Sequence, residues 1–151
     1  KTKFSNKKTM KWKREDLKAW TKIPTRWKDH DIYGHVNNVV YYSYFDTAVI
    51  GNLIRSTGND IRNLEAIGTV VESGCTFHKE IRFPQIIEAG LLVEKIGNSS
   101  ITYRVGLFLE EDPEPAASGH FVHVYVDHET RRPIRVPEII REALSPILIN
   151  A

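Results

Sequence analysis

The sequence predicts an α+β fold in which an antiparallel sheet wraps around one long buried helix. Residues 39–54 run for sixteen positions without a turn signal and carry apolar side chains on nearly every face. That length is too great for an ordinary strand, so a buried helix explains the segment better than its high strand propensity does. Beyond residue 70, several segments of strand length alternate in hydropathy. One strand before the helix and a meander after it complete the predicted order.

The predicted elements follow one another with short connections. A strand is expected over residues 21–29, then a turn containing Gly34, then Asn residues that can cap a helix from Asn38 to about Arg55. Gly74 is a candidate β-bulge in the first strand after the helix. Pro137 fits the first position of a terminal helix. The remaining predicted ranges are strands at 70–83, 88–96, 101–109, 118–126 and 132–136, and the terminal helix at 138–144.

Charge is distributed unevenly along the 151 residues, although the formal total is only +2. Residues 1–28 hold eleven basic and two acidic side chains, a net of +9, whereas residues 29–151 hold ten basic and seventeen acidic, a net of −7. The length suits a single domain that buries about 70% of its unfolded surface. We therefore expect residues 1–20 to form a basic leader and residues 21–151 to form the folded domain.

Two compositional features limit the classes of protein to consider. The chain has no apolar run of about 18 residues, which argues against a transmembrane helix. Its one cysteine, Cys75, cannot form an internal disulfide framework or a thiolate zinc site, which favours a reducing compartment. The first twenty residues also lack the apolar core of a secretory signal. We expect a cytoplasmic protein.

Reactive side chains concentrate at residues 29–38, where the first strand meets the long helix. A helix start offers free backbone N–H groups and the positive end of the helix dipole, and the carboxylate of Asp31 and the imidazole of His35 lie within a few residues. Donors for an oxyanion beside a carboxylate are what acyl transfer requires. The alternative is that Asp31, Asn37 and Asn38 only cap the helix while the histidines are solvated.

Residues 27–41 resemble the signature of the hot-dog-fold thioesterases, in particular the 4-hydroxybenzoyl-CoA thioesterase-like acyl-CoA hydrolases, with the plant acyl-ACP thioesterases as distant kin. The shared pattern is an aromatic residue, then D-x-D-x-x-G-H-V-N-N, then an aromatic-rich helix, and the resemblance covers about residues 21–145. It implies a single hot-dog domain that hydrolyses an acyl-CoA to a carboxylic acid and CoA. It also implies a homodimer or homotetramer with sites between subunits, no metal or redox cofactor, and no nucleic-acid or membrane partner.

Residue by residue, the resemblance implies that Asp31 is the catalytic carboxylate, either as nucleophile or as general base. The backbone N–H near Asn38 would polarise the thioester carbonyl, and His35 matches a histidine that is catalytic in the acyl-ACP branch. That branch carries Asn at the position of Tyr33, so this chain departs from it there. The residues expected to contact substrate are Tyr33, Gly34, Tyr41, Lys79 and Arg82.

The roles of these substrate contacts have simpler alternatives. Tyr41 belongs to an aromatic stripe that lines an acyl tunnel or else packs in the core. The CoA phosphates are met by Lys79 and Arg82, or by Arg131, Arg132 and Arg135, or else all of these are ordinary surface charges. The acyl length, and whether the thioester is carried by CoA or by a carrier protein, stay open.

Three other functions compete with thioester hydrolysis. His30, His35 and the two aspartates are a weak metal-ligand pattern, because the histidine spacing spans a turn and no second ligand cluster follows. A non-catalytic acyl-binding module would not need the Asp31 carboxylate. A basic leader with Trp12 and Trp20 could bind single-stranded nucleic acid. The intact D-x-D-x-x-G-H-V-N-N element favours the enzyme.

Overall fold

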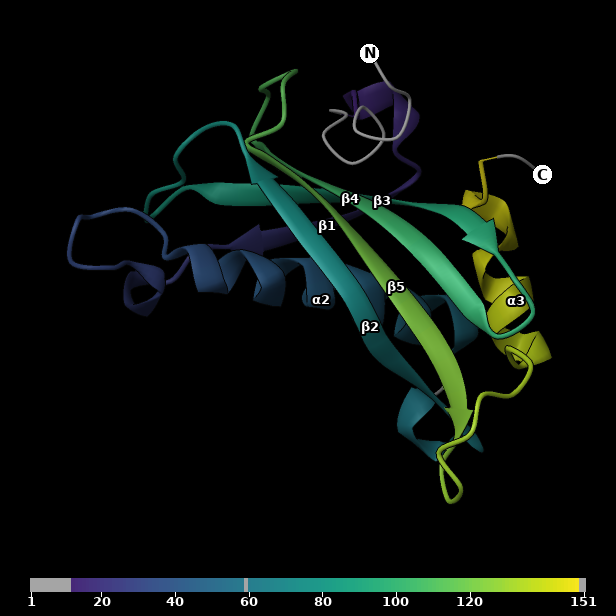
Figure 1. Ribbon diagram of the computed structural model, residues 1–151. Helices are drawn as coiled ribbons and strands as arrows, with labels where there is room; N and C mark the ends of the chain where they lie inside the picture. Colours follow the sequence, from purple (N-terminus) through teal and green to yellow (C-terminus); the bar gives the residue numbers. More distant parts are fainter. Residues whose placement is uncertain (1–11, 59, 150–151) are drawn as a thin grey trace, which may run out of the picture.

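The structure, a computed structural model, describes residues 12–58 and 60–149 and confirms the predicted α+β architecture. A five-stranded antiparallel sheet of order β1-β3-β4-β5-β2 curves around the helix α2 (Figure 1). The strands are β1 (Ala19–Pro24), β2 (Ala66–Phe77), β3 (Ile86–Ile96), β4 (Ser100–Leu109) and β5 (Ala117–Asp127). The helices are α2 (Asn38–Thr57) and α3 (Glu138–Leu144), with short 3-10 turns η1 (Arg14–Asp16), η2 (Trp27–Asp29), η3 (Ile61–Asn63) and η4 (Ser145–Ile147).

The long buried helix is confirmed, and it extends two residues beyond the predicted end. The Asn37 side chain caps it by accepting a hydrogen bond of 3.0 Å from the Val39 amide. Its side chains pack against the sheet, so burial overrides the strand propensity of the segment. The buried residues of α2 are Tyr41, Tyr44, Phe45, Ala48, Val49, Asn52 and Leu53.

The strand β5 turns its aromatic face toward α2. Phe121, His123 and Tyr125 are buried, whereas the valines that alternate with them are half-buried on the other face of the sheet. The rings of Phe45 and Phe121 meet edge to face, with centroids 6.0 Å apart. This packing places His123 inside the apolar core.

The predicted first strand is shorter than expected and is followed by a turn. It covers Ala19–Pro24, and after two connecting residues the 3-10 turn η2 occupies the end of the range 21–29. The turn forms because the Asp29 carboxylate accepts a hydrogen bond of 2.9 Å from the Arg26 amide, which folds the chain back on itself.

Three further predictions about the later elements are wrong. The bulge of β2 lies at Val71, where the register with β5 shifts, and not at Gly74. Residues 132–136 form no strand, because only an isolated bridge joins Val126 to Pro133, and proline lacks the N–H that a ladder needs. Pro137 is the N-cap of α3 rather than its first helical residue.

The described part of the predicted leader packs on the outer face of the sheet. Leu17 is buried against Leu92 and Phe108, and the Arg14 guanidinium donates hydrogen bonds of 2.9 and 2.7 Å to the carbonyls of Leu109 and Asp112. The division of the chain at residue 20 stays a prediction, and residues 1–11 lie outside the described residues. Within the described ranges, no helix has the length and apolar character needed to span a bilayer.

The close packing of β5 against α2 can be tested by substituting alanine for one glycine on each element. A Cβ on Gly119 would lie 2.5 Å from Phe45 Cζ, and 3.0 Å from the Gly74 carbonyl oxygen. We expect Gly119→Ala to lower the free energy of unfolding by about 1–3 kcal/mol, because the core must shift to admit a methyl group.

Gly51→Ala is the matched control in α2. Its Cβ meets only the flexible end of Arg55, at 3.2 Å, so the change should raise the free energy of unfolding by up to about 1 kcal/mol. Denaturant titration of both variants checks the pair. Equal stability of the two would contradict the packing described here.

Candidate functional site

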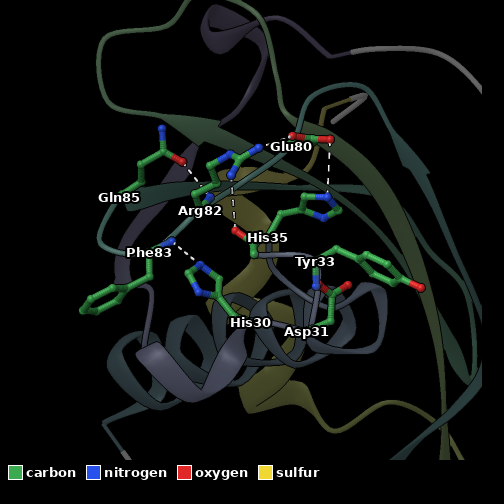
Figure 2. Close-up of polar contacts among 9 residues, drawn as sticks. His30, Asp31, Tyr33, His35, Glu80, Arg82, Phe83 and Gln85 are labelled. Atoms are coloured by element: carbon green, nitrogen blue, oxygen red, sulfur yellow. Dashed lines mark hydrogen bonds and ion pairs between the residues drawn. The ribbon is translucent and has the colours of Figure 1, made fainter.

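The loop before α2 presents Asp31 at the surface. The Asp31 amide donates to the His35 carbonyl at 3.0 Å, and the Gly34 amide donates to the Asp31 carbonyl at 3.2 Å. Gly34 has φ +86°, a left-handed conformation that favours glycine and lets the loop close. The Asp31 Oδ1 atom accepts a hydrogen bond of 2.8 Å from the Tyr33 amide (Figure 2). The half-buried carboxylate is therefore held in one orientation.

The neighbouring aspartate, Asp29, lies inside the protein. Its carboxylate accepts hydrogen bonds from the Arg26 amide at 2.9 Å, the Arg26 guanidinium at 2.9 and 3.1 Å, and the Tyr44 hydroxyl at 2.8 Å. Burial alone raises the pKa of Asp29, but these hydrogen bonds and the Arg26 charge outweigh it and hold the pKa below its usual value. Asp29 is thus a buried, ionised anchor that joins η2 to α2.

The start of α2 supplies donors beside this loop. Asn38 is the first helical residue and is exposed, and its amide belongs to the first turn, whose N–H groups have no partner within a helix. The Asn37 amide donates to the Asp29 carbonyl at 2.9 Å, so the buried anchor also fixes the helix start. The dipole of α2 adds positive potential at this point.

His35 opens onto a pocket of about 250 Å³ at the helix start. Its Nε2 atom lies 3.6 Å from the Glu80 carboxylate, toward which the ring points in Figure 2. The lining residues are His35, Val36, Asn38 and Tyr41 from the loop and helix, and Phe77, His78, Lys79 and Glu80 from the end of β2 and the segment after it. The structure therefore brings His35, Asn38, Tyr41 and Lys79 together. It places Asp31, Tyr33 and Gly34 on the adjoining turn, outside this lining.

Tyr41 forms part of the inner wall of the pocket. The side chain is buried, and its ring meets Phe77 edge to face at 4.8 Å. Burial raises the pKa of Tyr41 to about 12, so the hydroxyl stays neutral at physiological pH. Tyr33, in contrast, is 73% exposed.

The two predicted phosphate-binding cations already have acidic neighbours. The Lys79 Nζ atom lies 2.6 Å from Asp112, and the Arg82 guanidinium lies 3.0 Å from Glu80. Arg82 also approaches the Gly34 carbonyl at 3.4 Å, so it braces the Asp31 loop (Figure 2). Both are surface ion pairs, which leave a cation free to exchange partners at small cost.

Two contacts at the site have no signal in the sequence. Glu80 lies beside both His35 and Arg82, yet it is distant from the D-x-D-x-x-G-H-V-N-N element along the chain. The His30 Nε2 atom accepts a hydrogen bond of 2.7 Å from the Phe83 amide, which assigns this histidine to loop support. Among the described residues, no group of three or more His, Cys, Asp or Glu is arranged to hold a metal ion.

Comparison with known proteins identifies the family and the fold. Residues 25–144 match the model of the thioesterase-like superfamily. The structure resembles the PA5185 protein from Pseudomonas aeruginosa with a TM-score of 0.88 and 48% identity, over 93% of this chain and 99% of that one. It resembles the PA2801 protein of the same organism with a TM-score of 0.77 and 33% identity, over 84% and 98% of the two chains.

A more distant structural relative has a stated activity. A DHNA-CoA thioesterase from Staphylococcus aureus superposes with a TM-score of 0.75 at 24% identity, over 84% of this chain and 88% of that one. Identity at this level shows a common fold, which confirms the predicted hot-dog domain.

The different positions of the two aspartates predict different effects on stability. We expect Asp29→Asn to lower the free energy of unfolding by about 2 kcal/mol or more, because it removes a buried charge from its donors. Asp31→Asn should change it by less than about 0.5 kcal/mol, because Asn can still accept from the Tyr33 amide. Denaturant titration at pH 7 measures both.

The pH dependence gives a second readout of Asp29. Because folding lowers its pKa, its contribution is complete above the unfolded value of about 4 and is lost as the pH falls through the folded value. The stability difference between wild type and Asp29→Asn should therefore shrink below pH 4 or so. A difference that is constant over this range would mean that the Asp29 charge does not hold the turn.

Proposed function

The chain belongs to the thioesterase-like superfamily, whose reaction class is thioester hydrolysis, and we propose that it hydrolyses an acyl-CoA to a carboxylic acid and CoA through Asp31. The observation that carries the proposal is the Asp31 carboxylate, fixed through one oxygen by the Tyr33 amide, in the loop that ends at Asn38, the first residue of α2. The DHNA-CoA thioesterase of the same fold supports CoA as the carrier of the acyl group.

The carboxylate can act in two ways. As a nucleophile, Asp31 attacks the thioester carbonyl, the CoA thiolate leaves, and water hydrolyses the resulting anhydride to the acid and free Asp31. As a general base, Asp31 takes a proton from water, which attacks the carbonyl while the thiolate leaves. A thiol has a pKa near 8.5, about 7 units below that of water, so the leaving thiolate needs no proton donor.

The start of α2 supports the same reaction by stabilising negative charge. Attack at the carbonyl moves charge onto its oxygen, and a preorganised N–H such as that of Asn38 lowers the energy of that state. The helix dipole acts in the same direction. His35 lines the pocket beside Asn38 with Glu80 at 3.6 Å, so we assign it to positioning the substrate.

The sheet edge at β2 favours a homodimer or homotetramer. Val70 and Val71 on this strand are 45% and 58% exposed, and β2 pairs with a neighbour on one side only. An exposed apolar edge strand is a template for pairing with another chain. A second copy that adds its own β2 would close the edge and bring two Asp31 loops to one interface.

The leader gives less support to nucleic-acid binding. The Trp20 ring packs on Phe108 with centroids 5.6 Å apart, and the Arg14 guanidinium lies 5.5 Å from the Trp20 centroid. Trp20 is therefore engaged with the sheet rather than free to stack on bases.

Substitution of the carboxylate tests the reaction. Asp31→Asn should reduce CoA release from a panel of short, aromatic and long-chain acyl-CoAs by at least about a thousandfold, because the amide is neither nucleophile nor base. His35→Ala should slow turnover by less, as expected for a positioning residue. A colorimetric thiol assay measures both. Wild-type turnover by Asp31→Asn would contradict the proposal. Equal losses of turnover in Asp31→Asn and His35→Ala would assign His35 to the chemical step.

A charge on the exposed edge tests the assembly. We expect Val71→Lys to shift the protein toward the monomer, because a charge on an edge strand disfavours its pairing with another chain. Light scattering after size-exclusion chromatography measures the mass. His128→Lys, in the exposed turn after β5, adds the same charge elsewhere and should leave the mass unchanged. An unaltered oligomer in Val71→Lys would place the interface on another surface.

A further inference from the structure

A second cavity lies at the opposite end of α2 from the Asp31 loop. It has a volume of about 190 Å³ and is lined by the second half of α2, the turn η3, the first residues of β2 and part of β5. Figure 1 shows η3 and the start of β2 at the far end of the helix. The first lining residue on α2, Ile50, comes twelve residues after Asn38, which is roughly 18 Å along the helix axis. Apolar side chains dominate the lining, which includes Ile50, Leu53, Leu64, Ala66 and Ile67.

His123 is a buried polar residue in the wall of this largely apolar cavity, beside Tyr125. The residue is only 2% exposed and contributes to the wall, and within the described part of the chain its Nε2 atom has no hydrogen-bond partner. Its surroundings are aromatic, because the ring centroids of Tyr103 and Phe121 lie 5.2 and 6.0 Å away. A buried polar atom without a partner is costly, so its retention calls for a ligand group or a structural role.

The size and charge of the cavity define what it can hold. An apolar cavity of about 150 Å³ is known to bind benzene, so this one accommodates a ring or chain of about six carbons. Burial lowers the pKa of His123 to about 4, which keeps the imidazole uncharged at neutral pH. Arg62 lies at the rim, but its guanidinium is 2.6 Å from Asp60 and exposed. An uncharged hydrogen-bonding group therefore suits the interior better than a carboxylate does.

We propose that this cavity binds a ring or short chain of about six carbons that carries one uncharged hydroxyl or carbonyl group, which pairs with His123. Two sources can supply this chemistry: the end of the acyl group of the substrate, or a separate small molecule. The idea that the ligand is the acyl group of the substrate rests on the acyl-CoA hydrolysis proposed above, whereas binding of a small molecule in the cavity does not.

An acyl group can enter this cavity only if the Asp31 loop that cleaves it belongs to a second subunit. The Asp31 loop of the same chain is too distant, because a chain of six carbons spans much less than this separation along α2. The Val36 amide donates to the Ile81 carbonyl at 2.8 Å, so the Asp31 loop lies near the end of β2, while the cavity lies at its start. Antiparallel pairing of two β2 edges would bring the end of one strand opposite the start of the other. The cavity would then adjoin the loop of the second copy.

Binding is tested with two fluorinated probes and the full chain. We expect wild type to bind 4-fluorophenol about tenfold more tightly than 4-fluorotoluene, measured by ¹⁹F NMR, because only the phenol can pair with the imidazole. His123→Leu should abolish this preference while retaining 4-fluorotoluene, and His123→Gln, which keeps a donor and an acceptor, should preserve it. His128→Leu makes the same change at an exposed histidine and should have no effect. Absence of binding to wild type, or a preference that survives in His123→Leu, would overturn the proposal.

A change on the neighbouring strand of the same wall, where Gly68 of β2 pairs with Tyr125 of β5, locates the probe. A Cβ on Gly68 would lie 3.1 Å from Tyr125 Cζ and 3.4 Å from His123 Nδ1, so Gly68→Ala narrows the cavity with a single methyl group. Both probes should bind this variant several-fold more weakly. Unchanged affinity for both would place them outside the cavity and contradict the proposal.

Kinetics with matched substrates distinguish the two sources. If the acyl group enters the cavity, the ratio of kcat/KM for 6-hydroxyhexanoyl-CoA to that for hexanoyl-CoA should fall about tenfold in His123→Leu. If a separate molecule binds, the ratio in His123→Leu equals that of wild type, although this variant has still lost the preference for 4-fluorophenol. No turnover of any acyl-CoA by wild type would overturn the proposed function, but it would leave the NMR result as the test of the cavity.

Discussion

The buried carboxylate of Asp29 is the contact on which the geometry of the site depends. It takes hydrogen bonds from Arg26 on one side and from the Tyr44 hydroxyl on the other, so one ionised group joins the turn η2 to the helix α2. The Asp29 carbonyl also accepts from the Asn37 amide. With both ends of the loop fixed, the intervening residues can hold Asp31 at the surface in a single orientation. The first Asp of the D-x-D pair supports the site, and the second faces solvent, where a substrate can reach it.

The two ends of α2 have opposite chemical character. At the start, Asn38, His35 and nearby charges surround a pocket that, beside the positive end of the helix dipole, can accommodate developing negative charge. At the far end, apolar side chains and the neutral His123 enclose a cavity suited to an uncharged group. The helix separates these environments within one subunit, and pairing of β2 edges is the arrangement that would bring them together. In that arrangement, the proposed oligomerisation and the proposed substrate selection would both depend on the same sheet edge.

The sequence predicts the fold well because its strongest signals are long and periodic. The apolar run of α2 and the alternation of β4 and β5 each average over many residues, so local exceptions do not alter the outcome. Errors occur where one contact decides the backbone. The bulge at Val71 and the bridge at Pro133 depend on pairing with β5, and the turn at Trp27–Asp29 depends on a side chain folding back onto Arg26. None of these contacts has a periodic signature.

The site is predicted in part for the same reason. Asp31, His35 and Asn38 are close in sequence, so a motif can identify them together. Glu80 meets His35 only through folding, and His123 is a polar residue in an otherwise apolar inward face whose significance depends on the cavity beside it. The expected cations, Lys79 and Arg82, lie near the pocket, but their ion pairs with Asp112 and Glu80 could not be inferred from spacing.

The central claim is that the two aspartates of the motif divide support and chemistry between them. Its most direct test measures acyl-CoA turnover and the free energy of unfolding on the same preparations of Asp31→Asn and Asp29→Asn. The claim predicts that Asp31→Asn loses turnover at wild-type stability, whereas Asp29→Asn loses stability, and the fraction that remains folded still turns over substrate. Wild-type turnover in Asp31→Asn would contradict the claim. So would a loss of turnover in Asp31→Asn that is explained by unfolding of the variant.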